Sequence, residues 1–218
     1  MPHEAFADGL SLGVRTLGLD LSQQQLRQLL DYVDLIQKWT KVYNLTSVRT
    51  PEEILTHHLL DSLAVIKPLR QQTQSRQLRL LDVGTGAGLP AVAIAVCCPE
   101  IAVTGVDAVA KKAAFLQQAA VALRLDNLHS IHARVESLSV PYEVVSSRAF
   151  ASLADFVTTS HISLSNDGVW MAMKGKRPDA EIAELPPWAS VFHVEQLHVP
   201  GLQAERCIVW LKKTVVLP

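Results

Sequence analysis

Three glycines at alternate positions form the most informative motif of the chain. Gly84, Gly86 and Gly88 follow the acidic Asp82 in the pattern D-x-G-x-G-x-G, at the point where an apolar run ends. Glycines at such a turn let the backbone adopt positive φ and approach a ligand closely. A dinucleotide fingerprint or a Walker loop needs a further glycine at position 89, where Leu89 stands. The motif therefore offers bare backbone and no lysine for phosphates, which suits a cofactor without phosphate groups.

An acidic residue at a second turn adds to this candidate site. Asp107 ends another apolar run, about 20 residues beyond Gly84, where nucleotide-binding βαβ units place an acid that binds the ribose hydroxyls. The alternative is that Asp107 only caps a helix that begins near Ala110, and one carboxylate can serve both purposes. Together, the loop and the acid favour a site for S-adenosylmethionine.

The residues around the motif alternate between strand-like and helix-like patterns, which is typical of βαβ units and a mostly parallel sheet. The predicted strands are Leu78–Val83, Ile101–Val106, Leu128–His132, Glu143–Ser146 and Val169–Met173. The predicted helices are Pro90–Cys97, Ala110–Leu125 and Leu153–Ser163. Two later strands, Ala189–Val199 and Arg206–Val216, have no convincing helix between them, so we expect them to pair antiparallel at the sheet edge. The fold class is α/β.

Helical periodicity dominates the chain before this alternation. Ser22 and Thr50 each begin a capping box, with Gln25 and Glu53 three residues further on. Apolar residues then recur at steps of three and four, which indicates one buried face of a helix. A polar tract at residues 70–77 separates this part from the alternating part. We expect an N-terminal helical extension over residues 1–69 and a second domain over residues 78–218.

Composition argues for a folded chain in a reducing compartment. Of the 218 residues, 49% are hydrophobic and 19% are charged, which is too apolar for a disordered chain. The net charge of −1 gives no global basic field, so nucleic-acid binding has to depend on a local patch. The three cysteines cannot form a disulfide framework, no apolar run is long enough to span a membrane, and the histidines show no metal-ligand spacing. We expect a cytoplasmic protein without a metal or a membrane anchor, and a monomer.

Several short blocks follow one another in order along nearly the whole chain. They are Tyr43–Val48, His58–Ser62, Asp82–Pro90, Lys111–Leu116, Arg134–Glu136, Ser147–Leu153 and Lys174–Gly175. With these blocks the chain resembles the 16S rRNA guanine-N7 methyltransferases, also called the glucose-inhibited division protein B family. The resemblance implies a class I S-adenosylmethionine-dependent methyltransferase fold, Rossmann-like with a seven-stranded, mostly parallel sheet. It also implies that the cofactor is contacted by Gly84, Leu89, Val135, Glu136 and Arg148.

The substrate that the resemblance implies is a guanine in the 530 loop of 16S rRNA (guanine 527 by rRNA numbering), in the small ribosomal subunit. Guanine N7 has an exposed lone pair and no proton to lose, so its attack on a sulfonium methyl group needs alignment rather than a general base. Arg148, at the end of the fourth strand, can hold the cofactor carboxylate, the O6 edge of the base or an RNA phosphate. The alternative for Arg148 is a salt bridge to a helix acid such as Asp155. The candidate catalytic residues are Arg148 and Lys174.

A local basic patch is the second candidate feature for substrate binding. The candidate substrate-binding residues are Asn44, His58, Asp61, Lys111, Lys112 and Lys174. The three lysines follow predicted strand ends and can bind RNA phosphates together with Arg148, whereas a run such as Lys176 and Arg177 is more often a solvated face. The residues of the helical extension either line the substrate mouth or bind the extension to the domain.

Two alternative functions remain open from the sequence. The first is an S-adenosylmethionine-dependent methyltransferase of another RNA site or of a small molecule, which the weak overall charge favours. The second is a non-catalytic ribosome-binding module with a vestigial cofactor site. The intact glycines and Asp107 argue against this second alternative.

Overall fold

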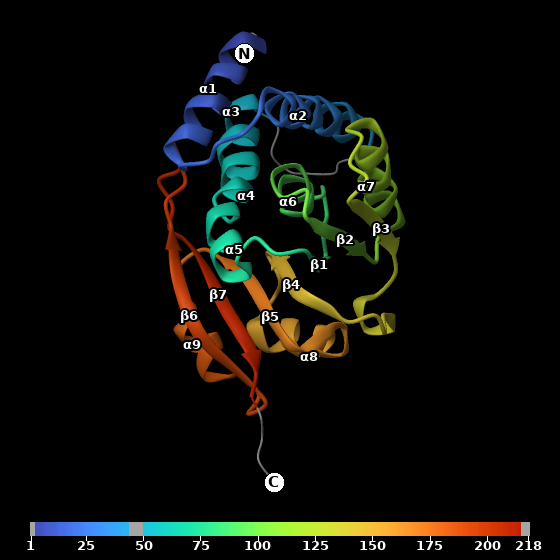
Figure 1. The fold of residues 1–218 in the computed structure, drawn as a ribbon, viewed down its shortest axis with the longest axis vertical. Coiled ribbons are helices and arrows are strands. Elements are labelled where there is room, and N and C mark those ends of the chain that lie inside the picture. Colours follow the sequence, from blue (N-terminus) through green and yellow to red (C-terminus); the bar gives the residue numbers. More distant parts are fainter. Residues whose placement is uncertain (1–2, 44–49, 215–218) are drawn as a thin grey trace.

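A single twisted sheet organises the molecule, which the computed structural model describes over residues 3–43 and 50–214 (Figure 1). Its strands lie in the order β3-β2-β1-β4-β5-β7-β6. The strands are β1 (Leu78–Val83), β2 (Ile101–Asp107), β3 (Leu128–His132), β4 (Tyr142–Arg148), β5 (Leu164–Lys174), β6 (Ala189–Leu197) and β7 (Arg206–Lys213). The first five are parallel, and β7 is antiparallel to both β5 and β6. The predicted seven-stranded, mostly parallel sheet and its antiparallel edge are confirmed.

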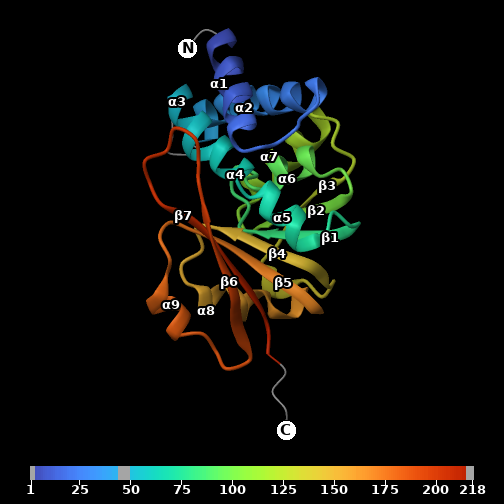
Figure 2. The same ribbon diagram turned by 60° about the vertical axis from the view of Figure 1, so that its left-hand side comes forward.

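Hydrophobic cores cover both faces of the sheet, because successive side chains of a strand point to opposite faces. Leu80 of β1 and Val144 of β4 belong to one core, and their neighbours Leu81 and Val145 belong to the other. The first core packs under α1 (His3–Thr16), α2 (Gln23–Tyr43), α5 (Ile66–Thr73), α6 (Ala91–Cys97) and α7 (Ala110–Ala122). The second packs under α8 (Leu153–Ser160), the 3-10 turn η2 (Val135–Ser137) and α9 (Asp179–Ala183). Figure 2 shows α1 and α2 at one end of the molecule and α8 and α9 at the other.

The helical segment before the sheet contains a π-helix that was not predicted. It runs through α3 (Pro51–Glu53), the π-helix η1 (Ile54–Leu60) and α4 (Asp61–Leu63) before α5.

Both predicted capping boxes are confirmed. The backbone amide of Gln25 donates to the Ser22 hydroxyl at 3.2 Å, and the backbone amide of Glu53 donates to the Thr50 hydroxyl at 3.3 Å. Helix α5 continues to Thr73, into the tract that was expected to separate two regions.

Side chains of the extension satisfy backbone carbonyls at the ends of the next helices, where intrahelical partners are missing. Gln25 donates through Nε2 to the Val96 carbonyl at 2.8 Å. Gln28 donates in the same way to the Leu123 carbonyl at 2.7 Å, at the end of α7. The extension therefore shares a hydrophobic core and polar contacts with the sheet layer. The predicted boundary between an extension over residues 1–69 and a domain over residues 78–218 stays a prediction.

Two further elements differ clearly from the sequence predictions, for local reasons. Strand β5 begins at Leu164 instead of Val169, because the polar residues 165–167 interrupt its apolar pattern. Helix α9 was not predicted, since its five residues carry no buried side chain and hence no apolar periodicity. Within residues 3–43 and 50–214, no helix is long and apolar enough to cross a membrane.

Candidate active site

The loop between β1 and α6 requires glycine at each of its three alternate positions. Gly84, Gly86 and Gly88 all have positive φ, of 66°, 59° and 87°. A Cβ atom on Gly88 would lie 3.0 Å from side-chain atoms of Leu116 and of Val92, whereas one on Gly84 would meet nothing within 4 Å. The loop is therefore packed tightly against its surroundings at Gly88. At Gly84 its backbone is uncovered, so a ligand can approach it closely.

Helix α2 supports this loop from the side of the first core. Tyr32 is fully buried, and its hydroxyl donates to the carbonyl of Ala87, between two of the glycines, at 2.5 Å. Burial raises the pKa of Tyr32 far above its ordinary value, so this group stays a hydrogen-bond donor. Leu89 is 3% exposed and packs in the same core, so its side chain lies beneath the loop. Its predicted contact with the cofactor stays a prediction.

Asp107 joins the end of β2 to the glycine loop. One carboxylate oxygen accepts from the Gly86 amide at 2.9 Å, and the other accepts from the Val109 amide at 2.9 Å. The N-cap residue of α7 is Val109, which makes no side-chain capping bond. The alternative that Asp107 itself caps the helix is wrong, because the acid lies two residues before the cap. Each of its oxygens keeps a lone pair for a ligand.

A cleft of about 300 Å³ opens at the carboxyl ends of β1 and β2. We call it the glycine-loop cleft, and its lining includes Gly84, Asp107, Lys112, Val135, Glu136 and Phe150. The structure thus brings four of the eight predicted cofactor residues to this cleft, whereas Arg148 lines another cleft and Gly86, Gly88 and Leu89 are not part of the lining. Phe150 was missed, because a phenylalanine in a loop carries no signal that separates a ligand contact from a core position. These residues suit a nucleoside ligand, with a carboxylate for hydroxyl groups and an aromatic ring for an apolar face.

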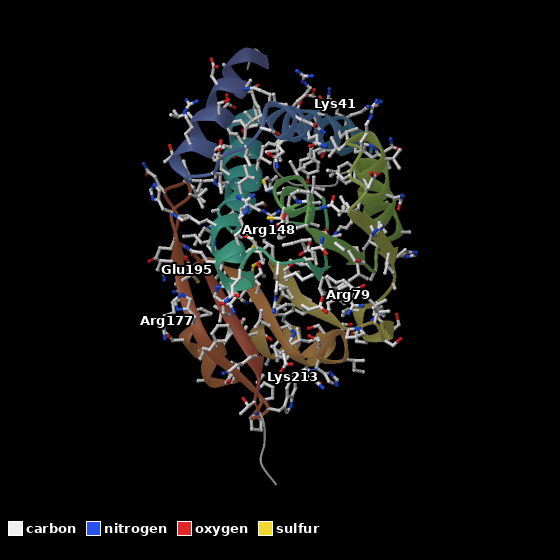
Figure 3. The ribbon with its side chains drawn as sticks, in the orientation of Figure 1. Lys41, Arg79, Arg148, Arg177, Glu195 and Lys213 are labelled. Atoms are coloured by element: carbon white, nitrogen blue, oxygen red, sulfur yellow. The ribbon has the colours of Figure 1, made fainter. Side chains whose placement is uncertain are left out.

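A second cleft, of about 450 Å³, lies beyond the end of β4. We call it the arginine cleft, and its lining includes His58, Asp61, Arg148, Ala149, Lys174 and Arg206. Arg148 is the last residue of β4 and lies near the middle of the molecule (Figure 3). Four predicted site residues therefore converge here, and Arg206 of β7 adds a second guanidinium that sequence reasoning missed.

Asp61 is the shared counter-ion of the two arginines. Its carboxylate is 4% exposed, lies 3.3 Å from Arg148 Nη1 and accepts from Arg206 Nε at 2.9 Å. The predicted alternative, a salt bridge from Arg148 to a helix acid, is confirmed, but the partner is Asp61 of α4. The suggested Asp155 is the wrong acid, because it accepts instead from the Ser152 hydroxyl at the start of α8. Asp61 thus both lines the cleft and binds the helical extension to the sheet. The two possibilities that the sequence left open are compatible.

The π-helix presents His58 to the arginine cleft. Burial and the nearby Arg148 guanidinium lower the pKa of His58 from 6.5 to about 4, so the imidazole is neutral at pH 7. The carbonyl of the preceding His57 accepts from Arg148 Nη1 at 3.4 Å. Short π-helical stretches occur frequently at functional sites, where the wider turn redirects side chains. Here the π-helix brings a neutral imidazole and a carbonyl beside the guanidinium.

Asp82 lies between the two clefts, at the end of β1. It is fully buried, and its Oδ1 accepts from the Ser146 hydroxyl of β4 at 2.8 Å. Burial raises the pKa of Asp82 from 3.8 to about 6, against the opposing effects of the Thr85 and Ser146 hydroxyls and of Arg148. Positive charge on Arg148 therefore acts on groups of both β1 and the π-helix.

The predicted basic residues do not converge on one patch. Lys112 lines the glycine-loop cleft, whereas Lys174 lines the arginine cleft and forms an ion pair with Glu181 at 2.7 Å. Lys111 is exposed at the start of α7. Arg177 pairs with Asp179 at 2.6 Å on the surface. Asn44 lies outside the described residues.

A third and larger cleft, of about 730 Å³, lies at the amino ends of the strands. Its polar lining includes Arg79 and Glu143, which form an ion pair at 3.2 Å, and contains no predicted site residue. In the part of the chain that the structure describes, no group of three His, Cys, Asp or Glu residues could hold a metal ion. The candidate chemistry therefore lies at the carboxyl ends of the parallel strands, as is usual for open α/β sheets.

Comparison with known proteins gives a consistent result. The family model "GidB: rRNA small subunit methyltransferase G" matches residues 25–209. A protein named ribosomal RNA small subunit methyltransferase G from Acidovorax sp. (strain JS42) is 61% identical over 218 residues, which cover 96% of each chain. A protein of the same name from Polaromonas sp. (strain JS666) is 62% identical over 207 residues, covering 93% of this chain and 92% of the relative.

Solved structures resemble the chain in fold. TrmN from Thermus thermophilus superposes with a TM-score of 0.55 at 19% identity, over 73% of this chain and 53% of that protein. Coclaurine N-methyltransferase, bound to N-methylheliamine and SAH, superposes with a TM-score of 0.54 at 11% identity, over 89% of this chain and 74% of that protein. At these identities the likeness shows the Rossmann-like methyltransferase fold alone.

Proposed function

Since the chain belongs to the rRNA small subunit methyltransferase G (GidB) family, we propose that it transfers a methyl group from S-adenosylmethionine to N7 of a guanine in the 530 loop of 16S rRNA. The observation that carries this proposal is the meeting of two clefts at one short segment. Phe150 lines the glycine-loop cleft, and its neighbours Arg148 and Ala149 line the arginine cleft. A cofactor in one cleft and a base in the other would approach each other across this segment.

The glycine-loop cleft fits the cofactor. Gly84 offers bare backbone for close approach, and the free lone pairs of Asp107 can accept from ribose hydroxyl groups. Val135 and Glu136 also line this cleft, where an apolar and a polar contact are available to the adenosine part. The bound cofactor supplies an electrophilic methyl group on a sulfonium. The loop motif itself carries no lysine of the kind that a phosphate-binding loop has, in agreement with a cofactor that has no phosphate.

The arginine cleft fits a guanine and its phosphates. Guanidinium groups donate in a planar fork that matches O6 and N7 of guanine or two oxygens of a phosphate. Arg148 and Arg206 are held side by side by Asp61, with side chains 20% and 24% exposed, so their remaining N–H groups can face a ligand. Neutral His58 adds no positive charge that would repel a sulfonium. Because N7 carries a free lone pair, these residues need only orient the base and exclude water.

Methyl transfer to RNA tests the proposal. Purified protein is incubated with labelled S-adenosylmethionine and, separately, with small ribosomal subunits, with their naked RNA and with a metabolite extract, all from a strain that lacks this gene. We expect label in the small-subunit RNA. Label only in the metabolite extract would assign a small-molecule methyltransferase. RNA binding without any label, despite bound cofactor, would assign a non-catalytic module.

A further inference from the structure

The segment that separates the two clefts has a strained backbone. Arg148 ends β4, and the next residue, Ala149, has a φ of 62°. A left-handed conformation is unfavourable for a residue other than glycine, and it persists only where the surroundings hold it. Such positions gather at functional sites. Something outside the segment must therefore hold residues 148–153 in place.

Two side chains from outside the segment, Lys174 of β5 and Glu181 of α9, supply that support. Lys174, the last residue of β5, donates through Nζ to the Phe150 carbonyl at 3.4 Å and to Glu181 Oε2 at 2.7 Å. The same Glu181 oxygen accepts from the backbone amide of Leu153 at 2.7 Å. The ammonium and the carboxylate thus hold the segment at two points, its middle and its end. The exposed fractions of the two side chains are only 12% and 28%.

We propose that Lys174 and Glu181 form a latch that fixes residues 148–153 between cofactor and base, and that both are positioning residues for methyl transfer. This inference rests on the proposed function, and it assigns Lys174 a role other than a contact with RNA phosphate. The partially buried ammonium already has a carboxylate and a carbonyl as acceptors. An ammonium has three N–H donors, so an RNA phosphate could use the third without displacing either acceptor. The variants below therefore separate a phosphate contact from the latch.

Helix α9 offers a matched control. Asp179 forms an ion pair of 2.6 Å with Arg177, but both side chains are more than half exposed, and among the described residues no hydrogen bond or ion pair joins either of them to residues 148–153. Glu181 and Asp179 lie on the same helix, carry the same charge and each pair with a basic side chain. They differ because only Glu181 also accepts from a backbone amide of the segment. If the local charge of α9 alone matters, Asp179→Asn and Glu181→Gln will behave alike.

The test compares Lys174→Met, Glu181→Gln, their combination and Asp179→Asn in methyl transfer to small-subunit RNA and in RNA binding at several salt concentrations. We expect kcat to fall about 10- to 100-fold for Lys174→Met, because small displacements of a positioning group have effects of this size. Glu181→Gln keeps an acceptor for the Leu153 amide and should lose about tenfold. The double variant should be no slower than Lys174→Met, since both changes break one device. KM values, RNA affinity and its salt dependence should stay close to those of the wild type.

A direct phosphate contact predicts the opposite pattern. Lys174→Met would then weaken RNA binding and lower the slope of log K against log salt by about 0.7 to 0.9. Glu181→Gln would free the ammonium and strengthen RNA binding. Either result, or an unchanged kcat in both single variants, overturns the latch. If Lys174→Met fails to fold, Glu181→Gln alone decides between the two roles. RNA binding can be measured without turnover, and a wild type that methylates no RNA would refute the proposed function and leave this comparison interpretable.

Discussion

Replacing Tyr32 with phenylalanine tests whether the helical extension helps to form the cofactor site. The substitution keeps the buried ring, whose centroid lies 6.3 Å from that of Phe115, and removes only the hydroxyl that donates to the Ala87 carbonyl. Ala87 lies between Gly86 and Gly88, which both have positive φ. The loop would therefore lose a hydrogen bond at its centre without losing apolar contacts.

The size of the effect follows from the burial of the two groups. Tyr32 is fully buried and Ala87 is 9% exposed, so water cannot easily replace the lost donor. A buried hydrogen bond contributes about 1 kcal/mol, and a carbonyl left unsatisfied costs about 1–3 kcal/mol. We expect Tyr32→Phe to lower the free energy of unfolding by about 1–2 kcal/mol. If about 1 kcal/mol of this must be recovered when the loop is ordered around the cofactor, the dissociation constant rises roughly fivefold.

Calorimetric titration with S-adenosylmethionine and urea unfolding measure the two quantities. Tyr142→Phe is the control, because Tyr142 is 5% exposed and begins β4, at the opposite end of that strand from Arg148. It should leave cofactor affinity unchanged. Equal affinities for Tyr32→Phe and the wild type, with equal stability, would show that the hydrogen bond to Ala87 contributes nothing to the loop.

Three further predictions concern the clefts and the acid between them. Arg148→Ala should lower methyl transfer about 100-fold or more while circular dichroism stays native, because one preorganised donor contributes about this much; near-normal turnover would remove Arg148 from the site. Asp107→Asn turns an amide donor toward the backbone N–H of Gly86 or Val109 and should weaken cofactor binding by about 2 kcal/mol, or roughly 30-fold; unchanged binding in a calorimeter would contradict this. Burial keeps Asp82 protonated up to about pH 6 in the folded state, whereas the unfolded chain releases the proton near 3.8, so stability falls as pH rises through this window. The unfolding free energy of the wild type minus that of Asp82→Asn should therefore drop by roughly 2–3 kcal/mol between pH 4 and pH 7, and a constant difference would refute the raised pKa.

The sequence alone predicted the parts of the fold that depend on local pattern. The glycine motif, the strand before it and Asp107 at the end of the next strand lie together in the structure, because parallel strands bring their carboxyl ends to one edge. The two capping boxes also formed as predicted, since each involves residues only three positions apart. Such features need no knowledge of distant contacts.

Several missed features depend on pairs of residues that are far apart in the chain. Asp61 pairs with Arg148 and Arg206, which follow it by 87 and 145 positions, and Tyr32 reaches Ala87 across 55 positions. A single sequence does not say which acid meets which arginine, so a nearer acid, Asp155, was the wrong choice for Arg148. Glu181 gave no signal for a different, local reason, because the short exposed helix α9 carries no apolar pattern.

The most direct test of the central claim is the position and chemistry of the methyl group. Small-subunit RNA from a strain lacking this gene is incubated with the purified protein and unlabelled S-adenosylmethionine, then treated with borohydride and aniline, which cleave the chain at N7-methylguanine, and mapped by primer extension. The account predicts one new cleavage, at a guanine of the 530 loop, that depends on both protein and cofactor. Methyl transfer to the RNA in a parallel reaction with labelled cofactor but no cleavage there, or cleavage at another guanine, would contradict it.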